Sequence, residues 1–216
     1  MIELFQIYLD YFLHPFKTNH DFNQQRLALS EKKIERLTFV ESISISWLLM
    51  ALKSLIWGLF IVLFLKYIAP SLEFSFLKKN AIDLSEFKDV SVYLYLVLEL
   101  VFFPLMAWFW LEFWKLMIIA GRYLFEKNFT NEDISQVLVV AMSSHIIKIV
   151  PFFGDFLFML SSGLAIFAGL RENLQLGVGQ GLFILVTPLL LLCGLFFILF
   201  LVLIFFIAEL TLLAPF

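Results

Sequence analysis

The chain is poor in charge and in cysteine. Only 15% of its residues are charged, the net charge is −3, and Cys193 is the single cysteine. One cysteine cannot form an intrachain disulfide framework. The small negative charge also offers no basic surface to a polyanion, so we expect no nucleic-acid partner.

Motifs for catalysis and metal binding are missing as well. The sequence has no G-x-S-x-G elbow, no H-E-x-x-H and no P-loop. His14, His20 and His145 lie far apart in the sequence and lack carboxylates at ligand spacing. We therefore expect no enzymatic activity, no metal site and no cofactor.

Apolar residues make up most of the chain. They account for 62% of it, with a mean hydropathy of +0.96, and no charged residue occurs between Asn173 and Ala208. A helix rises about 1.5 Å per residue and the hydrocarbon core of a bilayer is about 30 Å thick, so this run is more than long enough to cross. We expect an integral, multi-pass membrane protein with the lipid bilayer as its solvent.

The expected fold is an all-α membrane bundle of about five spans, residues 43–216, preceded by an N-terminal cytosolic or interfacial helical segment, residues 1–42. One helix over the third and fourth apolar segments would extend about 55 Å, nearly twice the bilayer core, so a tight hairpin is favoured there. A kinked re-entrant pair is the alternative. The predicted spans cover residues 43–69, 90–111, 134–150, 156–170 and 181–208.

Small residues and prolines mark features of these spans. Ser161, Ala165 and Gly169 recur at the four-residue spacing that lets membrane helices approach closely, which predicts a packing face. Pro151 separates the third and fourth spans, and Pro188 interrupts the fifth. We expect a kink at each proline.

The distribution of Lys and Arg predicts the orientation. With the N-terminus inside, eight basic residues are cytosolic and four are external, which favours a cytosolic N-terminus and an external C-terminus. In a bacterium the membrane would be the inner membrane. The cytosolic set is Lys17, Arg26, Lys32, Lys33, Arg36, Arg122, Lys127 and Arg171, and the external set is Lys78, Lys79, Lys88 and Lys148.

The first sixteen residues form an amphipathic pattern. Phe5, Tyr8, Leu9, Phe12 and Phe16 are spaced by one to four residues along one helical face. The segment is too short and too often charged to span. It therefore lies in the headgroup plane or packs on the bundle. Binding to the apolar surface of a partner is an equally open interpretation.

Three ionisable residues fall at a similar depth on three different predicted spans: Lys53, Glu99 and His145. Charges inside a bilayer are costly, so they usually face the bundle interior and pair with one another. The three residues are therefore a candidate intramembrane polar cluster. Alternatively, Lys53 snorkels to the headgroups, and His145 bonds a neighbouring backbone carbonyl.

From Ala107 onward the order of features resembles the YIP1 family of five-span membrane proteins. The resemblance implies five helices with a cytosolic N-terminus and a non-enzymatic role in binding other membrane proteins, and it brings no catalytic residues. The segments that carry it are Leu116–Gly121, Val139–Ser144, Pro151–Gly154, Gly169–Asn173 and the final apolar helix interrupted at Pro188.

Two functions remain open on the sequence. The first is a non-enzymatic membrane protein that binds or organises other membrane proteins, or itself, as a scaffold or accessory subunit of a membrane complex or an export or trafficking system. The alternative is a transporter or channel component that uses the polar cluster of Lys53, Glu99 and His145.

Overall fold

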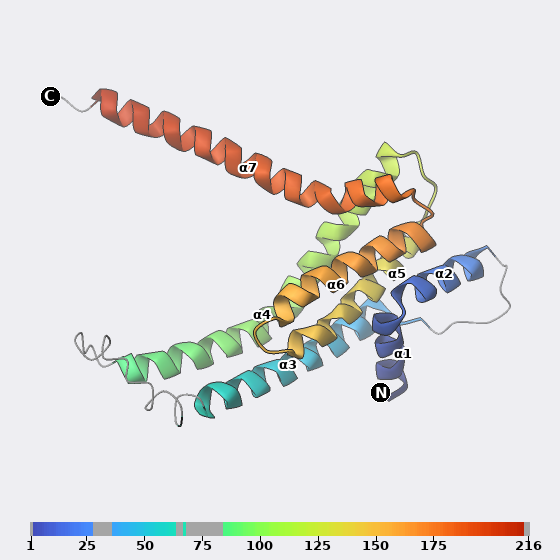
Figure 1. Ribbon diagram of the computed structural model, residues 1–216, viewed down its shortest axis with the longest axis horizontal. Coiled ribbons are helices and arrows are strands. Elements are labelled where there is room, and N and C mark those ends of the chain that lie inside the picture. Colours follow the sequence, from blue (N-terminus) through green and yellow to red (C-terminus); the bar gives the residue numbers. More distant parts are fainter. Residues whose placement is uncertain (1, 28–35, 64–66, 68–83, 214–216) are drawn as a thin grey trace.

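A computed structural model describes residues 2–27, 36–63, 67 and 84–213 (Figure 1). All regular secondary structure within these residues is helical, which confirms the all-α prediction. The predicted end of the first span at residue 69 and the predicted external residues Lys78 and Lys79 lie outside the described residues. The elements are α1 (Ile2–Leu13), α2 (Pro15–Arg26), α3 (Phe39–Leu63), α4 (Leu84–Leu124), α5 (Asn131–Met142), the 3-10 helix η3 (Ser143–Ile149), α6 (Gly154–Ala168), the π-helical turn η4 (Gly169–Asn173) and α7 (Val178–Leu213).

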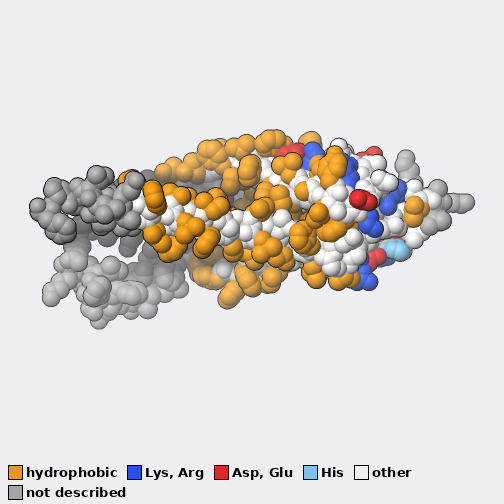
Figure 2. Space-filling view, turned by 90° about the horizontal axis from the view of Figure 1, so that it is seen from above, with side chains coloured by type: hydrophobic (Ala, Val, Ile, Leu, Met, Phe, Trp, Pro, Cys, Tyr) orange, Lys and Arg blue, Asp and Glu red, His pale blue; other side chains and the backbone are white. Residues whose placement is uncertain are grey.

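Four helical segments are long and apolar enough to cross a membrane, which confirms an integral, multi-pass membrane protein. Hydrophobic side chains cover the middle of the molecule in Figure 2, whereas charged side chains gather at the end where α1 and α2 lie. The four segments are Phe39–Ile61, Leu96–Leu124, Gly154–Asn173 and Val178–Phe206.

The predicted third span, residues 134–150, is a broken helix. It begins in α5 and continues as η3 after Met142. From their residue counts, 12 and 7, the two pieces together extend about 32 Å, close to the thickness of the bilayer core. The count of five crossings stays a prediction, because it depends on counting this broken segment as one.

A tight turn joins η3 to α6 and makes the two arms a hairpin. Pro151 lies in this turn, Phe152 adopts a φ of 63°, and the Phe153 amide donates to the Pro151 carbonyl over 2.7 Å. A Cβ on Gly154 would come within 2.8 Å of the Lys148 carbonyl oxygen, so the close return of the chain requires glycine. The Pro-Phe-Phe-Gly sequence is thus a turn between two helices.

The small residues of α6 and η4 face the other arm of the hairpin. Ser161 Oγ donates to Ser144 Oγ over 3.1 Å, Ala165 is buried, and Gly169 lies directly against the Val137 side chain. No larger side chain fits between the arms at Gly169. Close approach of these helices therefore depends on the small residues.

Two long helices contain an internal proline. Pro104 lies within α4 and Pro188 within α7, and both helices bend in Figure 1. The first part of α7 packs on α4, where Ile184 fills the space above Gly121. The rest of α7 extends away from the bundle (Figure 1).

The N-terminal helices pack on the bundle at one end of α3. The Tyr8 hydroxyl donates to the Met142 carbonyl over 2.6 Å and lies 2.6 Å from Ser46 Oγ, so it links α1 to α3 and α5. The Tyr11 hydroxyl accepts from the Leu37 amide. Burial raises the pKa of Tyr8, and that of Tyr11 to about 12, so both hydroxyls stay neutral at physiological pH.

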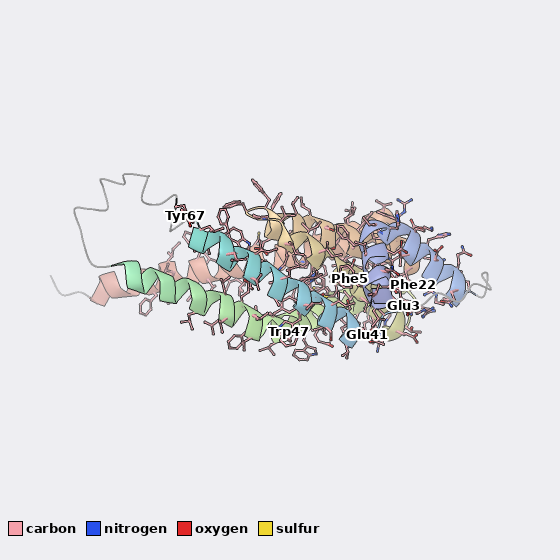
Figure 3. All side chains as sticks on the ribbon, turned by 90° about the horizontal axis from the view of Figure 1, so that it is seen from below. Glu3, Phe5, Phe22, Glu41, Trp47 and Tyr67 are labelled. Carbon is pink, nitrogen blue, oxygen red and sulfur yellow. The ribbon has the colours of Figure 1, made fainter. Side chains whose placement is uncertain are left out.

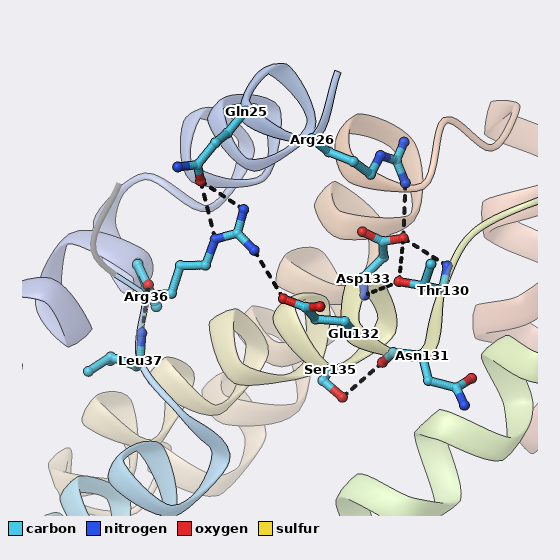
Figure 4. A network of polar contacts seen from close by, with 10 residues as sticks. Gln25, Arg26, Arg36, Leu37, Thr130, Asn131, Glu132, Asp133 and Ser135 are labelled. Carbon is cyan, nitrogen blue, oxygen red and sulfur yellow. Dashed lines mark hydrogen bonds and ion pairs between the residues drawn. The ribbon is translucent and has the colours of Figure 1, made fainter. Parts of the chain in front are cut away.

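Arg26, at the end of α2, contacts both ends of the hairpin, and Figure 4 shows its contact with Asp133. Its guanidinium lies 3.2 Å from the Asp133 carboxylate at the start of α5 and donates to the Asn173 carbonyl, over 3.1 Å, at the end of η4. Asp133 also accepts from Thr130 in the capping box that begins α5. A second arginine, Arg36, pairs with the exposed Glu132 at 3.4 Å.

Gly169→Ala is expected to destabilise the protein by about 1–3 kcal/mol, because the added methyl group would overlap the buried Val137. The control is Gly163→Ala, since a Cβ at Gly163 meets nothing within 4 Å. Thermal unfolding in detergent measures both. Equal melting temperatures for the two variants would show that the arms do not pack at Gly169.

Arg26→Met is expected to cost on the order of 1–3 kcal/mol, because it leaves the Asp133 carboxylate, only 9% exposed, without its cation. Arg36→Met should cost less than about 1 kcal/mol, since its partner Glu132 is 78% exposed. Denaturation of the two variants in the same detergent makes the comparison. A larger loss of stability in Arg36→Met than in Arg26→Met would contradict the conclusion that Arg26 holds the two ends of the hairpin together.

Candidate functional site

Four charged residues from α3, α4, η3 and α6 meet beside the hairpin turn. Lys53 Nζ donates to Glu99 Oε1 over 2.9 Å and lies 3.6 Å from Asp155 Oδ2, and Lys148 Nζ lies 3.4 Å from Asp155 Oδ1. We name this row, in the order Glu99, Lys53, Asp155, Lys148, the ion-pair chain. Its charges alternate in sign and sum to zero.

The buried face of α3 explains why Lys53 points inward. Ser42, Ser46, Leu49, Met50 and Lys53 are all buried and recur at helical spacing. Ser46 contacts Tyr8 of α1, and Met50 belongs to the hydrophobic core. Lys53 lies on the same face of α3, one turn further along the helix. Its side chain is only 9% exposed, and the ammonium lies against its carboxylate partners.

His145 lies apart from the ion-pair chain. Its Nδ1 donates to the Met142 carbonyl over 2.9 Å, and its ring packs between Phe103 and Phe158, with centroid separations of 5.3 and 4.4 Å. Among the described residues it forms no ion pair. The structure thus brings together Lys53 and Glu99 of the predicted cluster, and it places His145 in an aromatic environment.

Two cavities lie next to each other at this site. The first, the ion-pair pocket, has a volume of about 390 Å³ and is lined by Lys53, Trp57, Glu99, Lys148, Phe152 and Asp155, among others. The second, the aromatic pocket, has about 400 Å³ and is lined mainly by Phe103, Trp110, Phe113, His145, Lys148 and Phe158. Lys148 borders both, and its Nζ lies 4.3 Å from the centroid of the Phe158 ring.

The hairpin turn forms one wall of the ion-pair pocket. The positive φ of Phe152 directs its ring onto Trp57 of α3, with a centroid separation of 5.3 Å and a nearly perpendicular arrangement. Such edge-to-face contacts add to the energy of apolar burial. The turn therefore holds Asp155, three residues later, close to Lys53.

Sequence reasoning missed Lys148 and Asp155 as members of the site. The charge distribution predicts Lys148 on the external side, and Asp155 lies between the predicted spans 134–150 and 156–170. A usable signal exists, since two opposite charges flank an apolar Pro-Phe-Phe-Gly turn between hydrophobic segments. A turn this tight returns the chain on itself and brings the flanking charges together.

The predicted N-terminal surface, which extends over α1 and the start of α2, is divided between two environments. Tyr8 is buried against the bundle and Phe12 is half-buried, whereas Phe5, Leu9 and Phe16 remain exposed. Figure 3 shows Phe5 near Glu41, in the first turn of α3, and far from Tyr67. One face of α1 thus packs on the hairpin, and the other is open to lipid or to a partner.

Across the described ranges, no group of three or more His, Cys, Asp or Glu side chains could hold a metal ion. Comparisons with protein-family models, curated proteins and solved structures found no match for this chain. Any functional conclusion therefore depends on the residues themselves.

Lys53→Met is expected to destabilise the protein by about 3–5 kcal/mol, because it leaves the largely buried Glu99 without a cation and leaves Asp155 with Lys148 alone. Glu99→Gln should cost less, since Lys53 keeps Asp155 as a partner. The double variant should cost less than the sum of the single variants. Thermal unfolding in detergent measures the change in stability of each variant.

The half-buried pair of Glu112 and Lys115 on α4 is the matched control. Glu112→Gln, Lys115→Met and their double variant should each change stability by less than about 1 kcal/mol. If the stability losses of Lys53→Met and Glu99→Gln add up to the loss in the double variant, the two residues do not interact, which would contradict the proposed coupling.

Proposed function

We propose that this chain is a non-enzymatic integral membrane protein that binds or organises other membrane proteins, as a scaffold or accessory subunit of a membrane complex or of an export or trafficking system. The observation that carries the proposal is the exposure of α7. In the most apolar window of Val178–Phe206 no residue is buried within the chain. In this window the helix offers its whole circumference to its surroundings.

Glycine in the exposed part of α7 favours a protein partner over lipid alone. Gly194 lies in the helix interior, and a Cβ there would meet nothing within 4 Å. Glycine in a helix is less favourable than alanine by about 1 kcal/mol, and no contact within the described residues explains it. Small residues let a second membrane helix approach closely, so a helix seated at Gly194 would account for this residue.

The topology proposed for this function has five crossings, a cytosolic N-terminus and an external C-terminus. The length of the broken α5 and η3 segment supports the fifth crossing. Arg26, Arg36 and Arg171 lie at the hairpin base together with the N-terminal helices, which favours a cytosolic location for that end. The resemblance to the YIP1 family supports the same arrangement and a binding role.

A transporter or channel component remains the second candidate function. It is favoured by the ion pair of Lys53 and Glu99 beside a cavity between three membrane segments, because intramembrane charges often mark a substrate or proton path. Tracer flux into liposomes containing only this chain, with loss of flux in Glu99→Gln, would support it and would weaken the scaffold proposal.

Site-directed photo-crosslinking along α7 tests the scaffold proposal. With p-benzoyl-phenylalanine in place of Leu191 or Phe197, on the Gly194 face of the helix, we expect an adduct to a protein of discrete mass. The same group in place of Leu192 or Phe196, on the opposite face, should give none. Electrophoresis and mass spectrometry of the adducts supply the readout.

Gly194→Leu should abolish the adduct at Leu191, because a bulky side chain would fill the space at the glycine. Gly163→Leu on α6 is the control and should leave the adduct unchanged, since a Cβ at Gly163 also meets nothing within 4 Å. Labelling of lipids only, or equal labelling on both faces, would contradict the proposal.

A further inference from the structure

The ion-pair chain is open at both ends. Glu99 uses Oε1 to accept from Lys53, whereas its Oε2 makes no hydrogen bond within the described part of the chain. At the other end, the Lys148 ammonium has Asp155 as its one carboxylate partner among the described residues. An ammonium carries three N–H donors. The ion-pair pocket thus presents an unused acceptor at Glu99 and unused donors at Lys148.

The ends have opposite charges, and both line the same cavity. A ligand with an anionic and a cationic group would bind Lys148 with the first and Glu99 with the second, and it would close the row into a ring of alternating charges. The ion-pair chain is neutral as a whole, so a neutral zwitterion keeps the site neutral. A purely anionic ligand would leave an uncompensated charge in a medium of low dielectric constant.

The aromatic pocket adds a second, apolar part to the binding site. Glu99, Phe103 and Trp110 lie four and seven residues apart on one face of α4, so the two pockets follow the same face and meet at Lys148. From Glu99 to Phe113 this face extends about 21 Å. A charged site continued by an aromatic channel matches an amphiphile with a polar head and a hydrocarbon chain.

We infer that the two pockets together bind one phospholipid whose headgroup carries a phosphate and a primary ammonium group. The phosphate pairs with Lys148, the ammonium donates to Glu99, and an acyl chain lies along Phe103, Trp110 and Phe158. A quaternary ammonium has no N–H donor for Glu99, so the primary amine is the better ligand. This inference does not rest on the proposed partner of α7.

Native mass spectrometry of the purified full-length chain in detergent tests the inference on the unaltered protein. The probes are phosphatidylethanolamine, phosphatidylcholine and phosphatidylglycerol with identical acyl chains. Phosphatidylethanolamine should bind about tenfold more tightly than the other two, because only it satisfies both ends of the ion-pair chain. Equal affinity for the three lipids would overturn the inference.

The soluble headgroup separates the two pockets. Glycerophosphoethanolamine has the same charges without acyl chains, and it should bind at least about tenfold more weakly than the lipid, because it leaves the aromatic pocket empty. Equally tight binding would show that the aromatic pocket does not take an acyl chain, and it would overturn the assignment of a lipid.

Lys148→Met should lower the affinity for phosphatidylethanolamine about tenfold, because it removes the cation that pairs with the phosphate. Lys115→Met is the matched control, because Lys115 lies on α4 with an ion pair of its own and lines neither pocket. An unchanged affinity in Lys148→Met would overturn the role of Lys148. If that variant does not fold, the headgroup comparison on the unaltered chain still decides.

Discussion

Lys53 brings a positive charge into a helix that is otherwise apolar enough to span a membrane, and a charge at that position has to be paired. Its ammonium contacts Glu99 of α4 and Asp155 of α6, so one side chain joins three membrane segments. Because Asp155 follows the turn at Phe152, the pairing also fixes where the hairpin ends relative to α3. Lys53, Glu99 and Asp155 all line the cavity at the site.

The opposite end of the hairpin is held by a different set of polar contacts. Tyr8 links α1 to α3 and α5, and Arg26 joins the start of α5 to the end of η4. With both ends fixed, the small residues between the arms can pack at close range. From Leu189 to Phe206, α7 has no comparable polar contact among the described residues, since its side chains there are apolar and exposed. Its surroundings therefore determine its position.

Much of the architecture is predictable from the sequence, because hydropathy and length alone identify membrane helices. Counting helical rises also places Lys53 and Glu99 at one depth, and the structure joins them at 2.9 Å. The environment of Tyr8 could not be predicted, since an amphipathic pattern does not distinguish lipid from a protein surface. His145 could not be placed either, because its orientation depends on the change from α-helix to 3-10 helix after Met142. The contact of Asp155 with Lys53 could not be predicted either, because it depends on the geometry of the turn.

Solid-state NMR in lipid bilayers tests the ion pair most directly, through the dipolar contact between ¹⁵N-labelled lysine ammonium groups and ¹³C-labelled glutamate carboxyl groups. The account predicts a contact that corresponds to the 2.9 Å pair of Lys53 and Glu99 and that disappears in Lys53→Met. The contact between Lys115 and Glu112, at 3.2 Å, serves as an internal reference and should remain. If Lys53→Met leaves the spectrum unchanged, Lys53 and Glu99 do not pair in the membrane, and the central claim is contradicted.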